Sequence, residues 1–336
     1  PSAQAVALAA GEPAGLRVLD LCAAPGGKST HLAARMHNAG LLVCNEIHPT
    51  RARALQENLE RLGCIGAVTS VDPALLAQRW GAFFDLVLLD APCSGEGMFR
   101  KHDAAIAAWS QAHVEACVVR QSAILESAAK LVRGGGKIIY STCTFSPEEN
   151  EDQIARFLKK HNFFSQDVPA QHFLPHLERG EGHFVATLTK NLADENQPKA
   201  VPLRPLPNIW REFEREFSLP QGVALEFKGN IEIVHPELPS MDGIKALRLG
   251  VPVAQLEKNR LEPHHALAKI GQHHKQELEL HEVAAYLRGE TLSKDGAAGW
   301  VQLCFEGFGL GWGKRVAGTI KNHYPRRLRG QIAFED

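Results

Sequence analysis

The chain has 336 residues, of which 44% are hydrophobic and 22% are charged, as in folded proteins large enough for two domains. No apolar run approaches the roughly 20 residues that a membrane-spanning helix needs, which excludes a helical membrane protein. The formal net charge is −1, so the chain lacks the basic excess of many nucleic-acid binders, and any RNA contact has to come from a local patch.

Short apolar runs rich in branched residues alternate with helical patterns through the first half of the chain. This alternation is typical of the crossover units that build a mostly parallel sheet, so the predicted fold class is α/β. We expect strands at Arg17–Cys22, Leu41–Ile47, Ala67–Val71, Leu86–Asp90 and Lys137–Thr142, with a last strand at His183–Leu188. Helices are expected near Thr30–Met36 and Thr50–Leu62, within Ile106–Val132, and from Ser146-Pro147-Glu148-Glu149 onward.

A proline-rich stretch, Asn191–Pro207, follows this pattern and predicts a linker between two domains. Beyond it the signals are weaker and indicate a smaller mixed α/β unit. They are an amphipathic segment at Ile209–Phe217, strand-like runs at Val223–Phe227 and Ile231–Val234, and a β-like segment at Gly299–Gly313. The predicted domains are therefore residues 1–190 and 208–336, joined by residues 191–207.

The chain has seven cysteines, an odd number, and none of them forms a C-x-x-C pair. This pattern disfavours a disulfide framework and a zinc knuckle, and it favours the reducing cytoplasm. The opening Pro1-Ser2-Ala3 is neither a signal peptide nor a natural start, so we expect that an N-terminal region is missing from this sequence.

A glycine turn follows the first predicted strand, in Asp20-Leu21-Cys22-Ala23-Ala24-Pro25-Gly26-Gly27-Lys28. A turn of small residues between a strand and a helix lets the backbone approach a ligand at the carboxyl end of the sheet. Its last part resembles a phosphate-binding loop. However, Cys22 stands where that loop has its first glycine, and Pro25 removes an N–H group that the loop needs.

The alternative ligand is a nucleoside cofactor without phosphates. Glu46 follows the second strand about 20 residues beyond the glycines, where an acid can bind a ribose. Asp72 follows the third strand and can accept a hydrogen bond from an adenine amino group. Together with Asp20, these acids suit the cationic cofactor S-adenosylmethionine, although each can also be a simple helix cap.

Two cysteines follow strands that lead to the same face as the glycine turn: Cys93 in Asp90-Ala91-Pro92-Cys93 and Cys143 in Thr142-Cys143-Thr144. Carbon 5 of cytosine is a poor nucleophile until a thiolate adds to carbon 6, so two thiols beside a methyl-donor site predict methylation of a pyrimidine carbon. Asp90 is placed to hydrogen-bond the N3/N4 edge of the base as sulfur adds. Amino methyltransferases carry an aromatic residue after a similar proline, and its absence here argues against chemistry at a nitrogen.

The remaining cysteines are expected to pack as small hydrophobic residues. They are Cys44, Cys64 and Cys117, together with Cys22 and Cys304. Lys28 is expected to lower the pKa of a thiol or to contact substrate if its side chain points into the cleft.

With these motifs in view, the chain resembles the NOL1/NOP2/Sun family of RNA cytosine-5 methyltransferases. The resemblance rests on Asp20 to Lys28, Asp90 to Gly95, and Thr142-Cys143-Thr144, and it also includes Pro1-Ser2-Ala3. Further segments are similar to the bacterial RsmF (YebU) type, which modifies small-subunit ribosomal RNA. These segments are Gly95 to Lys101, Gly180 to Phe184, Gly311 to Lys314 and Lys321 to Pro325.

The resemblance implies a Rossmann-like methyltransferase sheet, S-adenosylmethionine as cofactor and a PUA-like RNA-binding domain near the C-terminus. It also implies that Cys143 is the nucleophile and that Cys93 assists release of the methylated RNA, an assignment that spacing alone leaves open. The predicted catalytic residues are Cys143, Cys93, Asp90 and Lys28. The predicted cofactor-binding residues are Cys22, Ala23, Ala24, Pro25, Gly26, Gly27, Lys28, Glu46, Arg51, Asp72 and Asp90.

A basic patch between Gly309 and Gly330 contains no acid and includes Trp312 and Tyr324. It predicts contact with an RNA backbone. Its basic residues are Lys314, Arg315, Lys321, Arg326, Arg327 and Arg329. The pairs His264-His265 and His273-His274 lack nearby cysteines and an H-E-x-x-H pattern, so we expect no metal site.

The motifs, together with what the resemblance implies, predict an enzyme that methylates carbon 5 of a cytosine in 16S ribosomal RNA. Ribosomal RNA or the small ribosomal subunit is the expected partner, and the enzyme is expected to be a monomer without membrane contact. Three alternatives remain at this point: a transfer RNA cytosine-5 methyltransferase, a catalytically silent assembly factor that binds ribosomal RNA, and a P-loop ATPase.

Overall fold

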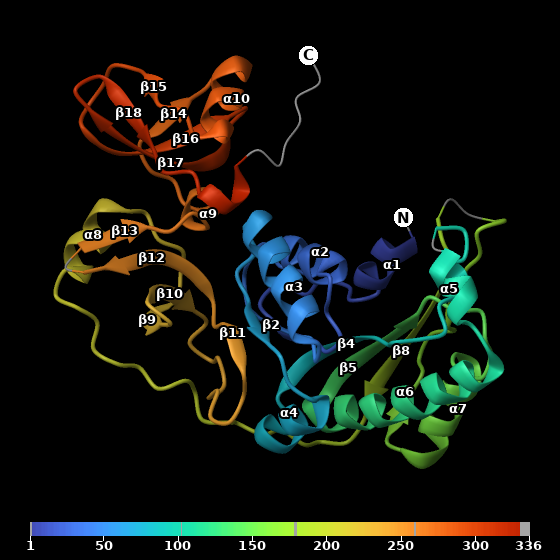
Figure 1. Cartoon of the computed structure of the whole chain (residues 1–336). Helices are drawn as coiled ribbons and strands as arrows, with labels where there is room; N and C mark the ends of the chain where they lie inside the picture. The colour runs from blue at the N-terminus through green and yellow to red at the C-terminus, as the bar shows by residue number, and fades with distance from the viewer. Residues whose placement is uncertain (1, 102, 178–179, 259, 330–336) are drawn as a thin grey trace. The chain divides into compact units, whose positions relative to one another are not determined.

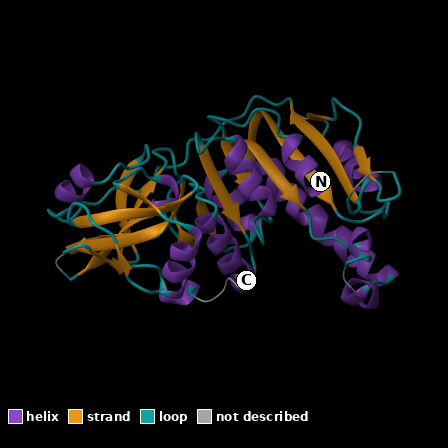
Figure 2. Ribbon diagram, turned by 90° about the horizontal axis from the view of Figure 1, so that it is seen from above, coloured by secondary structure: helices purple, strands orange, loops and turns teal. Residues whose placement is uncertain are grey.

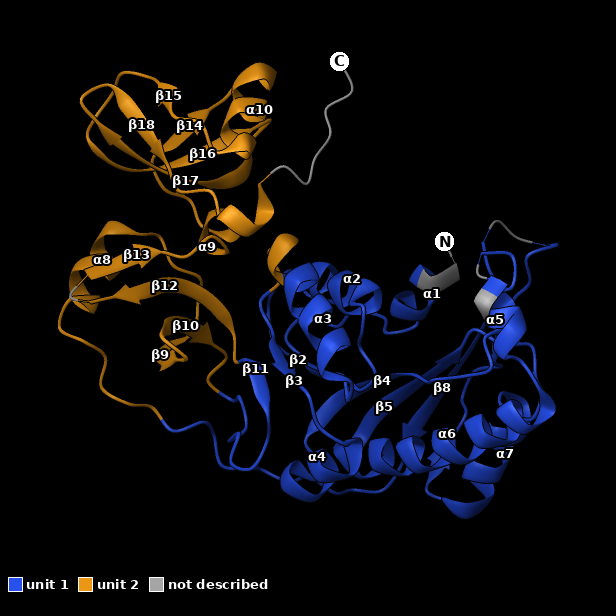
Figure 3. Cartoon of the chain, viewed as in Figure 1, with its two compact units in different colours: residues 1–59, 65–202, 237–248 blue, residues 60–64, 203–236, 249–336 orange. Residues whose placement is uncertain are grey.

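The computed structural model describes residues 2–101, 103–177, 180–258 and 260–329. Pro1 and Gly330, at the ends of two motifs named above, lie outside the described residues. The chain forms two compact units, shown in blue and orange in Figure 3. The first consists of residues 1–59, 65–202 and 237–248, and the second of residues 60–64, 203–236 and 249–336.

The first unit contains a mixed sheet whose strands follow the order β11-β3-β2-β1-β4-β5-β8-β6, with β7 paired to β8. The first five strands in the chain run parallel, whereas β8 is antiparallel to β5 and β11 is antiparallel to β3. These strands are β1 (Arg17–Asp20), β2 (Leu41–Asn45), β3 (Ala67–Thr69), β4 (Phe84–Asp90), β5 (Val132–Thr142), β6 (Phe164–Ser165), β7 (Gln171–Phe173), β8 (His183–Lys190) and β11 (Ala246–Arg248).

Helices cover both faces of this sheet (Figure 1), and Figure 2 shows the helices in purple and the strands in orange from above. Helices α1, α2 and α3 lie on one face, and α4, α6 and α7 lie on the other. The first seven helices are α1 (Ser2–Leu8), α2 (Gly27–Arg35), α3 (Pro49–Arg61), α4 (Pro73–Trp80), α5 (Asp103–Ala108), α6 (Gln111–Leu131) and α7 (Glu151–Lys160). Because both faces are covered, the inner strands are buried almost completely, as in β2, where every residue is buried. The predicted α/β fold class is confirmed.

Two elements of this unit differ from the sequence prediction at the sheet edges. The strand β8 is not the last one, because β6 extends the sheet beyond it and β11 adds to the opposite edge next to β3. The strand β11 is only three residues long and comes from beyond the proline-rich stretch, so it carries no pattern that sequence alone can read. Helix α4 is also missing from the prediction, although Asp72 and Pro73 form its N-cap and first residue.

The sequence predicts a helix from Ser146 onward, and this prediction is wrong at its start, because α7 begins only at Glu151. Residues 146–150 instead form a turn. The Asn150 amide holds this turn in place: it accepts a hydrogen bond from Thr142 Oγ1 at 2.5 Å and donates to the Thr144 carbonyl oxygen at 3.1 Å. These side-chain bonds compete with helical ones and delay the start of the helix.

The second unit contains two smaller sheets. The first is antiparallel, with the order β13-β12-β10-β9, and follows α8 (Trp210–Glu216). Its strands are β9 (Val223–Phe227), β10 (Asn230–Val234), β12 (Val251–Glu257) and β13 (Arg260–Pro263). The predicted segments at Ile209–Phe217, Val223–Phe227 and Ile231–Val234 therefore agree with α8, β9 and β10.

The other sheet of the second unit has the order β14-β16-β17-β18-β15. Its strands are β14 (Lys275–Glu277), β15 (Leu292–Ser293), β16 (Gly299–Phe305), β17 (Phe308–Val316) and β18 (Thr319–Asn322). Helix α9 (Leu267–Ile270) precedes β14 in the chain, and α10 (Leu280–Arg288) lies between β14 and β15. Tyr286 of α10, Val301 and Leu303 of β16 and Ile320 of β18 pack in one hydrophobic core.

The two units do not correspond to one division of the chain at the predicted linker. Residues 237–248 return to the first unit, where β11 pairs with β3. The boundaries at residues 190 and 208 remain predictions. Among the described residues, no helix combines the length and the apolar character that crossing a membrane requires.

Candidate active site

A cleft of about 740 Å³ opens in the first unit at the carboxyl ends of the parallel strands. Strand β1 lies between β2 and β4, so chain connections leave it in opposite directions, and ligands bind at such a switch point in open α/β sheets. The cleft brings together eight residues predicted for the site. They are Cys22, Ala24, Glu46, Arg51, Asp72, Asp90, Cys93 and Cys143. Ala23, Pro25, Gly26, Gly27 and Lys28, also predicted, do not line it.

The glycine turn shapes one wall of the cleft. Gly26 is the N-cap of α2 with φ +109°, a left-handed conformation that favours glycine. Arg51 holds this turn, because its Nη2 donates to the Ala24 carbonyl oxygen at 2.9 Å. The same guanidinium pairs with Glu46 at 3.3 Å between Nη1 and Oε2. Arg51 therefore links the turn after β1 to the acid after β2.

The three acids at the strand ends have different environments. Glu46 lines the cleft and accepts a hydrogen bond from the His48 backbone N–H at 3.0 Å. Asp72 also lines the cleft, but it caps α4 by accepting from the Ala74 N–H at 2.8 Å. Asp20 differs from the expectation, because it is wholly buried behind the turn and accepts from Ser29 Oγ at 2.6 Å. Two of the three acids therefore face the cleft.

Burial raises the pKa of Asp20 from its ordinary value of 3.8 to about 7, and the nearby charge of Asp90 acts in the same direction. The folded protein thus keeps a proton on Asp20 that the unfolded chain releases. Because Asp20 binds more protons in the native state than in the unfolded state between pH 4 and 7, the contribution of Asp20 to the free energy of unfolding falls as the pH rises through this window.

Asp20→Asn is expected to remove this pH dependence. The difference in unfolding free energy between wild type and variant should change by at most about 1.4 kcal/mol per pH unit from pH 5 to 7, and stay constant above about pH 8. Urea denaturation at half-unit pH steps, without cofactor, measures it. Parallel stability curves for the two proteins would contradict the assignment of this proton to Asp20.

Lys28, Asp90 and Ser141 form a polar group beside the cleft. Lys28 Nζ lies 2.7 Å from Asp90 Oδ2, and Ser141 Oγ donates to Asp90 Oδ1 at 2.8 Å. Burial opposes the charge on Lys28, yet the Coulombic and hydrogen-bonding contributions of Asp90 prevail and raise the pKa of Lys28. Asp90 and Ser141 are neighbours because β4 and β5 pair in parallel at these two residues.

The two thiols meet where β4 and β5 end. Cys93 Sγ lies 3.3 Å from Cys143 Sγ, and the Cys143 backbone N–H donates to Cys93 Sγ at 3.3 Å. Both cysteines are partly exposed and free, whereas Cys44, Cys64, Cys117 and Cys304 are buried, in agreement with the packing role predicted for those four. Cys22 differs from that prediction, because it is partly exposed and lines the cleft.

The environment makes the two thiols unequal. The hydrogen bond from Cys93 lowers the pKa of Cys143, and the charge of Lys28 acts in the same direction, while burial and Asp90 oppose it. The same hydrogen bond and burial raise the pKa of Cys93 well above its ordinary value. These pKa directions favour ionisation of Cys143 before Cys93. Either thiol can donate the hydrogen bond that joins the two sulfur atoms, and once Cys143 is ionised only Cys93 can donate it.

Glu149, Gln121, Ser94 and Thr144 form a hydrogen-bonded group next to the two thiols, and none of them is among the predicted catalytic or cofactor-binding residues. All four are buried. Ser94 and Thr144 each follow one of the two cysteines, and their hydroxyl oxygens are 2.8 Å apart. The feature of the sequence that could have indicated them is a hydroxyl residue directly after each of the two cysteines.

The loop after Cys93 approaches Cys143 closely. The Gly97 N–H donates to the Cys143 carbonyl oxygen at 2.8 Å, and a Cβ at Gly97 would lie only 2.8 Å from that same oxygen. Glu96 accepts hydrogen bonds from the Phe145 N–H at 3.1 Å and from Trp109 Nε1 at 2.7 Å. The motif Gly95-Glu96-Gly97 thus joins the two cysteine loops.

His183 is a further buried residue near the charged group. It begins β8, next to Phe184, which pairs with Thr142. Burial and the positive charge of Lys28 lower the pKa of His183, while Asp90 acts in the opposite direction. The imidazole is therefore neutral at pH 7.

The predicted basic patch divides into exposed and engaged residues. Lys314, Lys321, Arg326 and Arg327 are exposed. Arg315 does not belong to the exposed patch, contrary to the prediction. It is buried, and its guanidinium donates to Gln276 Oε1 at 2.8 Å and to the Ala297 carbonyl oxygen. Arg329 is partly buried and donates to the Tyr324 carbonyl oxygen at 3.0 Å.

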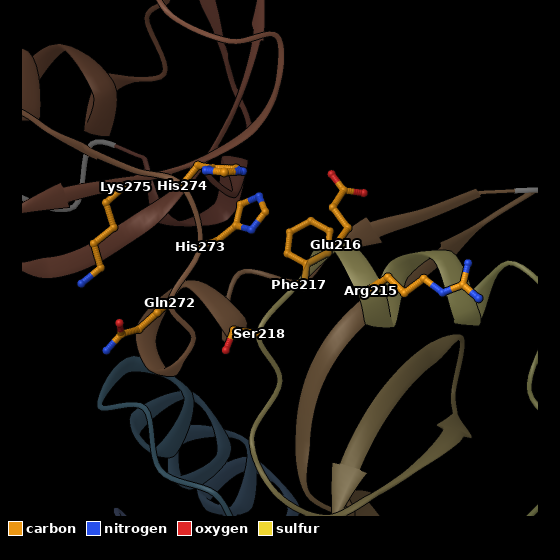
Figure 4. A pocket seen from close by; sticks show the side chains of 8 residues that line it. All are labelled: Arg215, Glu216, Phe217, Ser218, Gln272, His273, His274 and Lys275. Carbon is orange, nitrogen blue, oxygen red and sulfur yellow. The ribbon is translucent and has the colours of Figure 1, made fainter.

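A second cavity, of about 590 Å³, lies in the second unit between the end of α8 and the start of β14. Figure 4 shows that Arg215 and Lys275 extend to opposite sides of His273, so the two cations do not converge on one ligand. Throughout the described ranges, no three His, Cys, Asp or Glu side chains come together as metal ligands. The cleft with the two thiols is therefore the candidate active site.

Three family models match successive parts of the chain. The model described as 16S rRNA methyltransferase RsmB/F matches residues 5–189. The RsmF rRNA methyltransferase first C-terminal domain matches residues 210–269, and the methyltransferase RsmF PUA domain matches residues 273–330. The last match confirms the prediction of a PUA-like region.

Curated relatives agree with these matches. The ribosomal RNA small subunit methyltransferase F of Aeromonas hydrophila subsp. hydrophila is 33% identical over 347 residues, covering 93% of this chain and 73% of the relative. The protein of the same name from Erwinia tasmaniensis is 30% identical over 349 residues, with the same coverage.

The crystal structure of NSun6 from Pyrococcus horikoshii with SFG is 31% identical to the chain, with a TM-score of 0.51. The alignment covers 56% of this chain and 52% of that protein, so the chain spans about half of it. The fold and the family identify S-adenosylmethionine as the cofactor. Family models and relatives together show that the chain belongs to the RsmB/F family of 16S rRNA methyltransferases.

Proposed function

We propose that this methyltransferase modifies carbon 5 of a cytosine in small-subunit ribosomal RNA through a covalent bond between Cys143 and carbon 6 of the ring. The observation that carries the proposal is the pair of unequal thiols, 3.3 Å apart, in the cleft that Asp90 also lines. The curated relatives, named ribosomal RNA small subunit methyltransferase F, support the choice of RNA.

The cleft suits the cofactor chemically. Glu46 and Asp72 offer carboxylates to the hydroxyl and amino groups of a nucleoside, while Cys22 and Ala24 bring the turn close without the N–H cradle of a phosphate loop. Bound S-adenosylmethionine supplies a methyl group on a positively charged sulfur. Lys28, which a phosphate loop would direct at a phosphate, is instead paired with Asp90, and this pairing disfavours the ATPase alternative.

Cys143 starts the reaction as a thiolate. Its sulfur adds to carbon 6, and the electron pair of the C5–C6 double bond moves so that carbon 5 becomes nucleophilic. Asp90 is placed to bind the N4 amino group of the base, and the neighbouring Lys28 ammonium offsets negative charge that develops on the ring. The side chains of Asp90 and Lys28 therefore stabilise the addition.

Cys93 serves the last step. Carbon 5 next bonds to the methyl group, whose bond to the cofactor sulfur breaks. Water then accepts the proton of carbon 5, the C5–H electron pair restores the C5–C6 double bond, and the C6–S bond breaks so that Cys143 leaves with the electron pair as a thiolate. The Cys93 thiol lies 3.3 Å from that sulfur and can donate a hydrogen bond to it, which makes Cys143 a better leaving group. The same hydrogen bond thus stabilises the Cys143 thiolate both when it attacks carbon 6 and when it leaves.

The target cytosine has to leave its base stack to reach the cleft, so an RNA loop or a loosened helix junction is the expected substrate. Lys314 and Lys321 provide positive charge for contact with the phosphate backbone of the RNA. They are paired directly across β17 and β18, and both are exposed. Like charges in this position repel each other, and an RNA phosphate between them would relieve the repulsion.

Transfer of a labelled methyl group tests the proposed function. The protein, S-adenosylmethionine and small-subunit ribosomal RNA should yield 5-methylcytidine after nuclease digestion, with the site located by bisulfite sequencing. The same assay with transfer RNA distinguishes the transfer RNA alternative. Methylation at another atom, or binding of ribosomal RNA without methyl transfer to naked RNA or subunits, would contradict the proposal.

A further inference from the structure

The carboxylate of Glu149 is wholly buried and lies between the two loops that carry the thiols. It accepts hydrogen bonds from the Ser94 N–H at 3.1 Å, from Gln121 Nε2 at 2.6 Å and from Ser94 Oγ. All three donors are uncharged. A buried carboxylate that is held only by neutral donors depends on each of them, because each satisfies charge that water no longer solvates.

These bonds fix the backbone on both sides of Cys93. Ser94 follows Cys93, and Gln121, which binds Glu149, also donates to the Pro92 carbonyl oxygen at 3.0 Å. On the other side of the site, Ser94 Oγ contacts Thr144 Oγ1 at 2.8 Å, directly after Cys143. The carboxylate therefore ties the Cys93 loop to the loop that follows β5.

The backbone of Glu149 is itself anchored to the sheet. The Tyr140 hydroxyl donates to the Glu149 carbonyl oxygen at 2.7 Å, and Tyr140 is a buried residue of β5. Cys143 follows β5 directly, so the carboxylate and Cys143 share one rigid support. Of the two thiols, Cys93 is therefore the one whose position depends on the Glu149 carboxylate.

We infer that Glu149 is a positioning residue that sets the distance between the Cys93 and Cys143 sulfur atoms. This inference deepens the proposed function and rests on it for its catalytic meaning. Without the carboxylate, the Ser94 N–H and the Gln121 amide lose their charged acceptor, so Cys93 is held less firmly beside β5, although the bond between the Gly97 N–H and the Cys143 carbonyl oxygen remains. The hydrogen bond between the thiols then weakens, and Cys143 loses the interaction that favours its reactive form.

Glu149→Gln removes the charge and keeps the size. An amide keeps one acceptor oxygen, which can still face the Ser94 N–H and Gln121, and presents an NH₂ group to Ser94 Oγ. The three charge-assisted hydrogen bonds therefore become two weaker neutral ones and one whose direction is reversed. Glu148→Gln is the matched control. Glu148 is the preceding residue, is exposed, and accepts its bond from Ser146 instead.

Two reactions of the full chain report on the thiols without RNA or cofactor. The first is alkylation of Cys143 by iodoacetamide as a function of pH, followed by peptide mass spectrometry. We expect the rate at pH 7 to fall about tenfold in Glu149→Gln and to remain unchanged in Glu148→Gln, with the pH midpoint of the reaction shifted upward.

The second reaction is disulfide formation between Cys93 and Cys143 by diamide. The two thiols lose two protons and two electrons, and the azo group of diamide is reduced to a hydrazine. Since the sulfur atoms start 3.3 Å apart, a movement of about 1 Å should slow the reaction about tenfold in Glu149→Gln. Circular dichroism confirms that both variants are folded.

Ser94→Ala is the second variant, for use if Glu149→Gln does not fold. It removes only the hydroxyl bridge between Glu149 and Thr144, so both rates should fall by a smaller factor, about threefold. Wild-type rates of alkylation and of disulfide formation in a folded variant would overturn the inference. These rates do not depend on where RNA is methylated, so failure of the proposed function and failure of this inference are distinguishable.

Discussion

Replacing Cys143 with alanine should reduce methyl transfer to ribosomal RNA by about 10³-fold or more, because Cys143 is the proposed covalent nucleophile and the pKa of the neighbouring Cys93 thiol is raised well above its ordinary value. Cys93→Ala should have the opposite effect on the intermediate. It should leave RNA attached to the protein, since the sulfur of Cys143 then leaves without the hydrogen bond of the second thiol. Transfer of a labelled methyl group measures the first outcome, and denaturing gels with labelled RNA measure the covalent adduct.

The geometry explains why the two variants should differ. The neutral Cys93 thiol is a hydrogen-bond donor 3.3 Å from the Cys143 sulfur, and it stabilises negative charge there. Cys304→Ala is a suitable control, because Cys304 is buried in the second unit, away from the cleft. An adduct that forms in Cys143→Ala and is absent from Cys93→Ala would exchange the two roles.

Much of this site could be predicted because strand ends are readable in the sequence. The apolar run before Asp90 and the run before Thr142 define β4 and β5, and parallel neighbours end at the same edge of a sheet. This geometry places Cys93 near Cys143 although 50 residues separate them. Spacing could not assign the roles of the two cysteines. That assignment depends on which thiol donates the shared hydrogen bond and on the charges nearby.

Residues that act through long-range contacts could not be predicted. The sequence predicts a helix whose first turn contains Glu149, whereas Glu149 is buried and precedes α7, which begins at Glu151. Arg315 fitted a basic surface patch, yet it is buried against Gln276. In each case the sequence gives the residue type, but only tertiary contacts decide which way the side chain faces.

Asp90→Asn should lower methyl transfer by about 10²–10⁴-fold, the range that a positioned acid or base contributes to catalysis. The carboxylate accepts hydrogen bonds from Lys28 and Ser141, and it faces the cleft where the N4 edge of the cytosine is expected. Asparagine keeps the shape, but it replaces one acceptor oxygen with a donor and leaves Lys28 without its ion pair. A single-turnover methylation assay at saturating RNA measures the loss.

The same substitution separates activation of the ring from activation of the thiol. The negative charge of Asp90 opposes ionisation of Cys143, so Asp90→Asn should lower the pKa of that thiol and speed its alkylation while methyl transfer falls. Lys28→Gln is the matched variant. Because Lys28 favours the thiolate, its loss should slow alkylation and methyl transfer together. If Asp90→Asn slowed both reactions in parallel, Asp90 would be acting on the thiol, and its role on the base would have to be abandoned.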